Sequence, residues 1–92
     1  MKAKVYFTRE ITPEKVVELY HRLGVELPGK VAVKVHSGEK GNQNFLRPEF
    51  WKPMVEEVNG TIVECNTAYG DAAGGVRDHT EAHMELVEVH GW

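Results

Sequence analysis

Short apolar segments alternate along this chain with longer segments of helical periodicity, and this alternation restricts the possible folds more than any other feature. The segments rich in β-branched and aromatic residues predict strands over residues 4–8, 30–36 and 61–66. The segments of helical periodicity predict helices over residues 12–23, 49–58 and 76–89. Because strands that alternate with helices favour a parallel sheet with right-handed crossovers, the sequence predicts an α/β fold in β-α-β-α-β-α order.

The predicted helices begin and end at residues that suit those positions. Thr12 is a good N-cap, and Pro13 follows it at the first helical position, where its missing N–H costs nothing. Gly24 closes the first helix as a left-handed cap. Pro53 is tolerated only in a first helical turn, so we expect the second helix to begin near Glu49 or later.

The size of the chain restricts the architecture further. Its 92 residues are enough for one domain, over 1–92, and we expect a small three-layer domain with a parallel sheet of about three strands. A parallel sheet needs cover on both faces, and three apolar helix faces are few for that purpose. We therefore expect the chain to be the N-terminal part of a longer α/β protein, or to pair with a second copy as a homodimer. A complete mini-domain is the alternative.

Composition excludes several classes of protein. The net charge is −3 and no stripe of Lys and Arg is present, which argues against nucleic acid as a partner. No apolar run approaches the roughly 20 residues of a membrane helix, and the N-terminus lacks the apolar stretch of a secretory signal. The single Cys65 excludes a disulfide within the chain and a metal cluster held by this chain's cysteines alone. A cytoplasmic location fits these features.

Two polar, glycine-containing loops follow the second and third predicted strands, over 36–47 and 66–77. In parallel α/β sheets, ligands bind at the carboxyl ends of the strands, so these loops form the candidate site if they converge. The candidate ligand-binding residues are His36, Glu39, Asn42, Arg47, Asn66, Thr67 and Tyr69. We expect Asn42 or Asn66 to bond loop backbone, because such loops need side-chain partners to hold their shape. The alternative is that both loops are solvated connections.

Residue type suggests a chemistry for three of these side chains. His36 suits metal ligation or proton transfer, Glu39 suits a carboxylate ligand or base, and Arg47 suits a clamp on a substrate carboxylate or phosphate. We expect Arg47 to be partly buried and paired with Glu39 or Asp71, because an unpaired buried guanidinium is costly. The stretch "GDAAGGVR" lacks the Lys and hydroxyl of a P-loop. No catalytic residue is identified, and the sequence leaves open whether the protein is an enzyme.

Histidines supply the metal candidates. His79 and His83 stand four residues apart, which is a metal-ligand spacing on a helix, and His36 is the third candidate. The stretch "HTEAH" places its Glu where zinc peptidases do not have it. Two histidines on an acidic helix are more often ordinary surface residues, so both interpretations stay open.

Three motifs carry a resemblance to a known family. "VAVKVHSGEKGNQNFLRP", then "ECNTAYG", then "DHTEAHMELVEVHGW" resemble the N-terminal part of domain-of-unknown-function family 362, whose members are often labelled iron–sulfur-centre proteins. The match spans essentially the whole chain, and its first motif is the most specific. The polar positions shared with the family are His36, Glu39, Asn42, Arg47, Asn66, Thr67, Tyr69 and His79.

The resemblance implies a longer protein with a redox function. Family proteins extend beyond this segment, and their 4Fe-4S cluster lies on a ferredoxin-like part that is absent here, so this chain alone binds no cofactor. The expected function is thus the N-terminal α/β portion of an iron–sulfur redox protein, with a polar ligand or metal site at the strand ends. The alternative is a non-catalytic structural or docking module.

Overall fold

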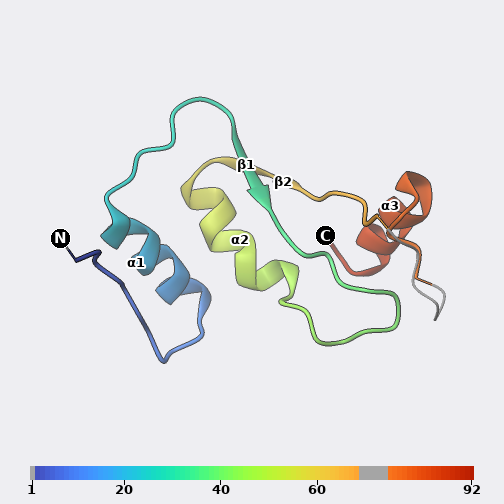
Figure 1. Ribbon diagram of the computed structural model, residues 1–92, viewed down its shortest axis with the longest axis horizontal. Coiled ribbons are helices and arrows are strands. Elements are labelled where there is room, and N and C mark those ends of the chain that lie inside the picture. Colours follow the sequence, from blue (N-terminus) through green and yellow to red (C-terminus); the bar gives the residue numbers. More distant parts are fainter. Residues whose placement is uncertain (1, 69–74) are drawn as a thin grey trace.

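The computed structural model describes residues 2–68 and 75–92 (Figure 1). The elements in chain order are α1 (Pro13–Leu23), β1 (Val31–Lys34), α2 (Pro48–Glu57), β2 (Gly60–Val63) and α3 (Thr80–Val89). The mixture of helices with a small parallel sheet confirms the α/β character expected from the sequence. Tyr69 and Asp71 lie outside the described residues.

The described sheet has two parallel strands. Val31 pairs with Gly60, and the register continues to Lys34 with Val63. The helix α2 connects the strands and packs against β2, which makes β1, α2 and β2 a βαβ unit (Figure 1). Gly60 allows the close approach of the strands, because a Cβ there would lie 2.7 Å from Val33 Cγ2.

Local sequence signals explain how α1 and α2 begin and end. Thr12 Oγ1 accepts the Lys15 N–H at 3.2 Å, and Gly24 caps the other end at φ +65°, as expected. The helix α2 begins at Pro48, so Pro53 lies in its interior rather than in its first turn. The expected position of Pro53 is therefore wrong: the helix continues past a residue that donates no backbone hydrogen bond.

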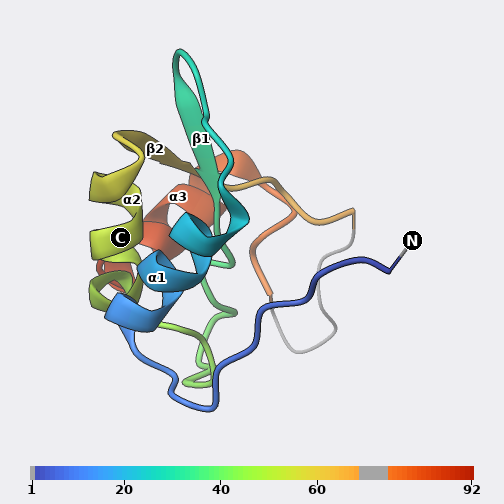
Figure 2. The same ribbon diagram turned by 90° about the vertical axis from the view of Figure 1, so that its left-hand side faces the viewer.

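Residues 4–8, the first predicted strand, do not form a strand in the described structure. They carry no strand assignment, and Val5 and Phe7 remain 85% and 79% exposed. Figure 2 shows this N-terminal segment beside α1. The helix α1 packs against α2, and the segment that precedes it stays on the outer side of this helix pair, away from β1.

The helix α3 begins at Thr80, four residues later than predicted. Residues before it form a turn, and the Thr67 N–H donates to the Arg77 carbonyl at 2.9 Å. This contact with the segment after β2 competes with an earlier helix start. Polar groups also dominate the interior of the described part of the chain: the buried large apolar side chains there are Val35 and Leu86, whereas the buried polar ones belong to Ser37, Arg77 and His83.

Candidate functional site

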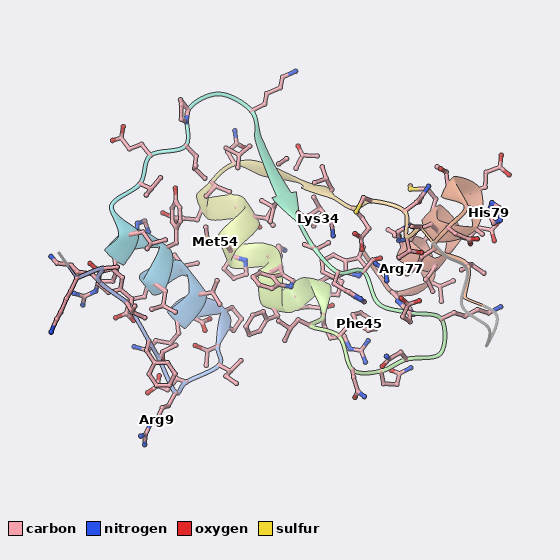
Figure 3. All side chains as sticks on the ribbon, in the orientation of Figure 1. Arg9, Lys34, Phe45, Met54, Arg77 and His79 are labelled. Atoms are coloured by element: carbon pink, nitrogen blue, oxygen red, sulfur yellow. The ribbon has the colours of Figure 1, made fainter. Side chains whose placement is uncertain are left out.

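A cluster of polar side chains lies where the sheet ends and α3 meets it (Figure 3). The residues come from the end of β1, from the segment after β2 and from the start of α3. We call them the edge cluster, and they are Lys34, Ser37, Glu64, Asn66, Arg77 and His83, with His36 and Glu39 at the rim.

Glu64 accepts more hydrogen bonds than any other side chain of the edge cluster. Its Oε2 accepts the Ser37 N–H at 2.9 Å, the Ser37 hydroxyl at 3.0 Å and Arg77 Nη2 at 3.3 Å. Lys34 Nζ and the Cys65 N–H reach its other oxygen. Burial alone would raise the pKa of Glu64, but the hydrogen bonds from Lys34, Ser37 and Cys65 outweigh it and lower the pKa to about 2.

Arg77 lies between two carboxylates. It is 7% exposed, its Nη1 donates to Glu39, and its Nη2 donates to Glu64. Burial lowers the pKa of Arg77, whereas the hydrogen bond and charge of Glu39 and the charge of Glu64 raise it, with a net rise. Within the described part of the chain, the buried Nε of Arg77 has no hydrogen-bond partner.

His83 connects α3 to both strand ends. Its Nε2 lies 3.1 Å from Ser37 Oγ, and its Nδ1 lies 3.0 Å from Asn66 Oδ1. Asn66 in turn donates from Nδ2 to Thr80 Oγ1 at 2.8 Å. A nucleophile, a histidine and a polar side chain that orients the histidine form, in this order, the triad of several hydrolases. Ser37, however, is only 1% exposed, so a substrate does not reach its hydroxyl in this arrangement.

The end of α3 is attached to the same loop. The Ser37 carbonyl accepts from His90 Nδ1 at 2.8 Å and from Trp92 Nε1 at 3.1 Å. Phe45 stacks on the His90 ring with centroids 4.5 Å apart. The loop after β1 is therefore held by both ends of α3.

The structure brings some of the predicted site residues together and separates others. His36, Glu39 and Asn66 belong to the edge cluster or its rim, so the two strand-end loops do meet. The Thr67 backbone bonds Arg77 nearby. Asn42 Oδ1 accepts the Asn44 N–H at 2.6 Å, which confirms the expected bond from a loop asparagine to backbone.

Arg47 is half-buried as predicted, but Glu39 is not its partner, and Asp71, the other predicted partner, lies outside the described residues. Its Nη2 donates to the carbonyl and side chain of Gln43, and its guanidinium lies 4.0 Å from the Phe45 ring centroid. Arg77 takes the carboxylate of Glu39 instead. A guanidinium over an aromatic ring needs no carboxylate partner, because the ring face carries partial negative charge.

The three candidate metal ligands do not come together. The His79 side chain is 80% exposed beside Asp78, His83 lies inside the edge cluster, and His36 contacts Gly38 and Arg77. Among the described residues, no group of three His, Cys, Asp or Glu side chains is placed to hold a metal ion. Cys65 is the one cysteine of the chain and is exposed, so the residues present do not fit a 4Fe-4S cluster, which needs several thiolates.

Four members of the edge cluster were absent from both the predicted ligand-binding set and the predicted metal candidates. Lys34, Ser37, Glu64 and Arg77 each lie within or beside the loops that the sequence singled out. Glu64 carried a readable signal, because it is a charge that directly follows the apolar strand Gly60–Val63. Such a charge is rarely buried without a partner.

Comparison with known protein families, with curated proteins and with solved structures finds no match for this chain. The family resemblance drawn from the motifs therefore stays a prediction. None of the helices described is long and apolar enough to cross a membrane. Surface hollows over the described residues are lined by the N-terminal segment, α1, the loop after α1 and α2, and one beside α3 is lined by Lys40, Val76 and Leu86.

Proposed function

We propose that this chain is a non-catalytic α/β docking module within a larger protein or assembly. The observation that carries the proposal is the mutual pairing of the charged groups of the edge cluster, where Lys34 and Arg77 face Glu64 and Glu39. Networks whose members satisfy one another fix a conformation, whereas a catalytic site keeps groups free for a substrate. The residues of the edge cluster other than His36 and Glu39 thus hold α3 against the end of the sheet.

Exposed apolar side chains support the docking part of the proposal. Val5, Phe7 and Ile11 before α1, and Met84 and Val89 on α3, are all more than half exposed. Exposed apolar side chains that gather on one face mark a protein interaction surface. We propose that the rest of a longer polypeptide, or a second copy, covers it.

The same proposal includes the strand that the sequence predicts over residues 4–8. No backbone hydrogen bond joins residues 2–7 to the rest of the described chain, and each strand of the two-stranded sheet has an open edge. We propose that residues 4–8 pair with β1 in the complete assembly, which gives the three-stranded, three-layer sheet expected from the sequence. The strand over residues 4–8, the helix α1 and the strand β1 would then form a second right-handed crossover.

The second candidate is the iron–sulfur redox role that the resemblance implies. In that case the cluster is bound by another part of a longer protein, and His36 at the rim is the residue that faces it. A cytoplasmic location belongs to this candidate as well. The exposure of the His36 side chain, beside buried neighbours, is the observation that favours it.

Metal content separates the two candidates. The experiment compares a longer protein that carries this segment with its His36→Ala variant, by metal analysis and visible absorption. Unchanged metal content and cluster spectra support the docking module. Metal loss or an altered cluster spectrum supports the redox role and contradicts the docking proposal.

A further inference from the structure

We propose that His36 and Arg77 form a binding site for the carboxylate of a small organic acid, and that Glu39 occupies this site as an internal substitute for the ligand. This inference goes beyond the docking role, because it concerns ligand binding at the point where Arg77 of the edge cluster meets His36 and Glu39 at its rim.

The first observation is that two hydrogen-bond donors face each other at the rim. The Gly38 N–H donates to His36 Nδ1 at 3.0 Å, so the ring hydrogen lies on Nε2. His36 Nε2 lies 3.4 Å from Arg77 Nη1, which is also a donor. Two neighbouring donors cannot bond each other, but both can bond one acceptor oxygen. His36 is exposed, so such an oxygen reaches it from solvent.

The second observation is the incomplete pairing of Arg77. Guanidinium has five N–H donors, and the buried Nε of Arg77 has no partner among the described residues. The Nε–H lies on the Nη2 side of the planar guanidinium, where Glu64 is bound, and a ligand in the place of Glu39 bonds Nη1. An unpaired donor leaves the positive charge of the guanidinium less fully compensated, which favours a second carboxylate on Arg77.

The third observation is that the two carboxylates on Arg77 differ in how firmly they are held. The Glu64 side chain is 10% exposed and accepts from Ser37, Lys34 and Arg77. The Glu39 side chain is 30% exposed, and Arg77 is its one bonding partner in the described structure. Glu39 also lies in the short stretch between Gly38, at φ +97°, and Gly41, at φ +78°. The permanent partner is therefore Glu64, and the exchangeable one is Glu39.

Charge supports exchange with a single carboxylate. Glu64 shares its charge between Lys34 and Arg77, so Arg77 needs one further negative charge, which Glu39 supplies. A ligand carboxylate that replaces Glu39 leaves the charge of the inner cluster unchanged. A dianionic phosphate would bring an excess negative charge beside Glu64.

The experiment is a titration of the isolated chain with acetate, followed by NMR through the Arg77 Nε–H and the His36 ring signals. Glu39→Gln removes the competing charge and keeps the side-chain shape, so we expect it to lower the acetate dissociation constant by about tenfold, equivalent to about 1.4 kcal/mol. The matched control is Glu49→Gln on the exposed surface of α2, which should leave the constant unchanged.

Two further variants keep the proposal testable. Adding His36→Ala to Glu39→Gln should reverse the gain in acetate affinity. Glu39→Asp shortens the competing side chain but keeps its charge, so it should give a smaller gain in acetate affinity. Equal acetate affinity in Glu39→Gln, Glu49→Gln and the unmodified chain would overturn the proposal. So would a gain that survives His36→Ala, or inorganic phosphate binding as tightly as acetate.

Discussion

At the scale of single residues, Glu64 is the group on which the interior of this chain most depends. Five donors from four residues converge on its two oxygens. The site therefore requires a negative charge, because Lys34 and Arg77 would otherwise face each other with Glu39 as their one remaining counterion in the described structure. Removing one member of a buried ion pair costs more than the pair itself contributes, since the other member stays buried and uncompensated.

Glu64→Gln should accordingly lower the free energy of unfolding at neutral pH by about 3 kcal/mol. Urea unfolding followed by circular dichroism measures the change. The matched control is Glu56→Gln, whose side chain is 66% exposed and lies 3.9 Å from Lys52, and its effect should stay within about 0.5 kcal/mol. Equal effects of the two substitutions would contradict the central role of Glu64.

The same carboxylate predicts an acid-dependent loss of stability. The pKa of Glu64 is lowered from 4.5 to about 2, so the folded state binds its proton less readily than the unfolded state does. The contribution is complete above about pH 4.5 and is lost as the pH falls towards 2, with an upper limit of roughly 3 kcal/mol. Unfolding measured from pH 6 to pH 2 should show a steeper decline for the unmodified chain than for Glu64→Gln, whereas parallel curves would contradict this assignment.

At the scale of elements, the loop after β1 is shaped by glycines with different surroundings. Gly38 has φ +97°, and a Cβ there would lie 2.6 Å from Phe45 Cδ1 and 2.7 Å from His90 Nδ1. Gly41 has φ +78°, but a Cβ there would meet no atom within 4 Å. Gly38 therefore permits both a left-handed backbone and the packing of α3 on the loop, whereas Gly41 permits the backbone conformation alone.

Gly38→Ala should destabilise the fold by about 3 kcal/mol, because the steric clash adds to the cost of the left-handed backbone. Gly41→Ala should cost about 1 kcal/mol from the backbone term alone. Thermal unfolding of the two variants gives the comparison. A Gly38 variant as stable as the Gly41 variant would show that His90 and Phe45 do not pack on this loop.

The helix α1 and the parallel pair of β1 and β2 were predictable from the sequence, whereas the position of residues 4–8 and the partner of Glu39 were not. The helix α1 matched its prediction because Thr12 and Gly24 cap it through bonds within a few residues. Residues 4–8 have the composition of a strand, but pairing depends on a neighbour that local sequence does not specify. In the candidate site, the loop containing His36 and Glu39 was identifiable, whereas the choice of Arg77 over Arg47 as partner of Glu39 depended on how α3 packs.

At the scale of the whole molecule, the described apolar core is very small. Val35 and Leu86 are the large apolar side chains that are less than about a tenth exposed, whereas Ile62 and Val63 on β2 are more than a third exposed. A domain of this length has a total stability of only about 5–14 kcal/mol even when well packed. A single core substitution therefore removes a large fraction of the stability.

Leu86→Ala should cost about 3 kcal/mol and leave a substantial unfolded population at 37 °C. Met84→Ala is the matched control on the same helix, because that side chain is 61% exposed, and it should change stability by less than about 0.5 kcal/mol. Chemical denaturation of both variants measures the difference. A tolerated Leu86→Ala would mean that the edge cluster, and not apolar packing, holds α3.

The parallel pairing of β1 with β2 also has a kinetic consequence. Each residue of β1 pairs with a residue that lies a whole helix further along the chain, so the ladder cannot form as a local hairpin. The chain must bring α2 into place before the strands pair, and we expect the transition state for folding to contain the βαβ unit while α1 is still unformed. Thr12→Ala should then speed unfolding without slowing folding, as stopped-flow fluorescence would measure, because the α1 cap forms after the rate-limiting step.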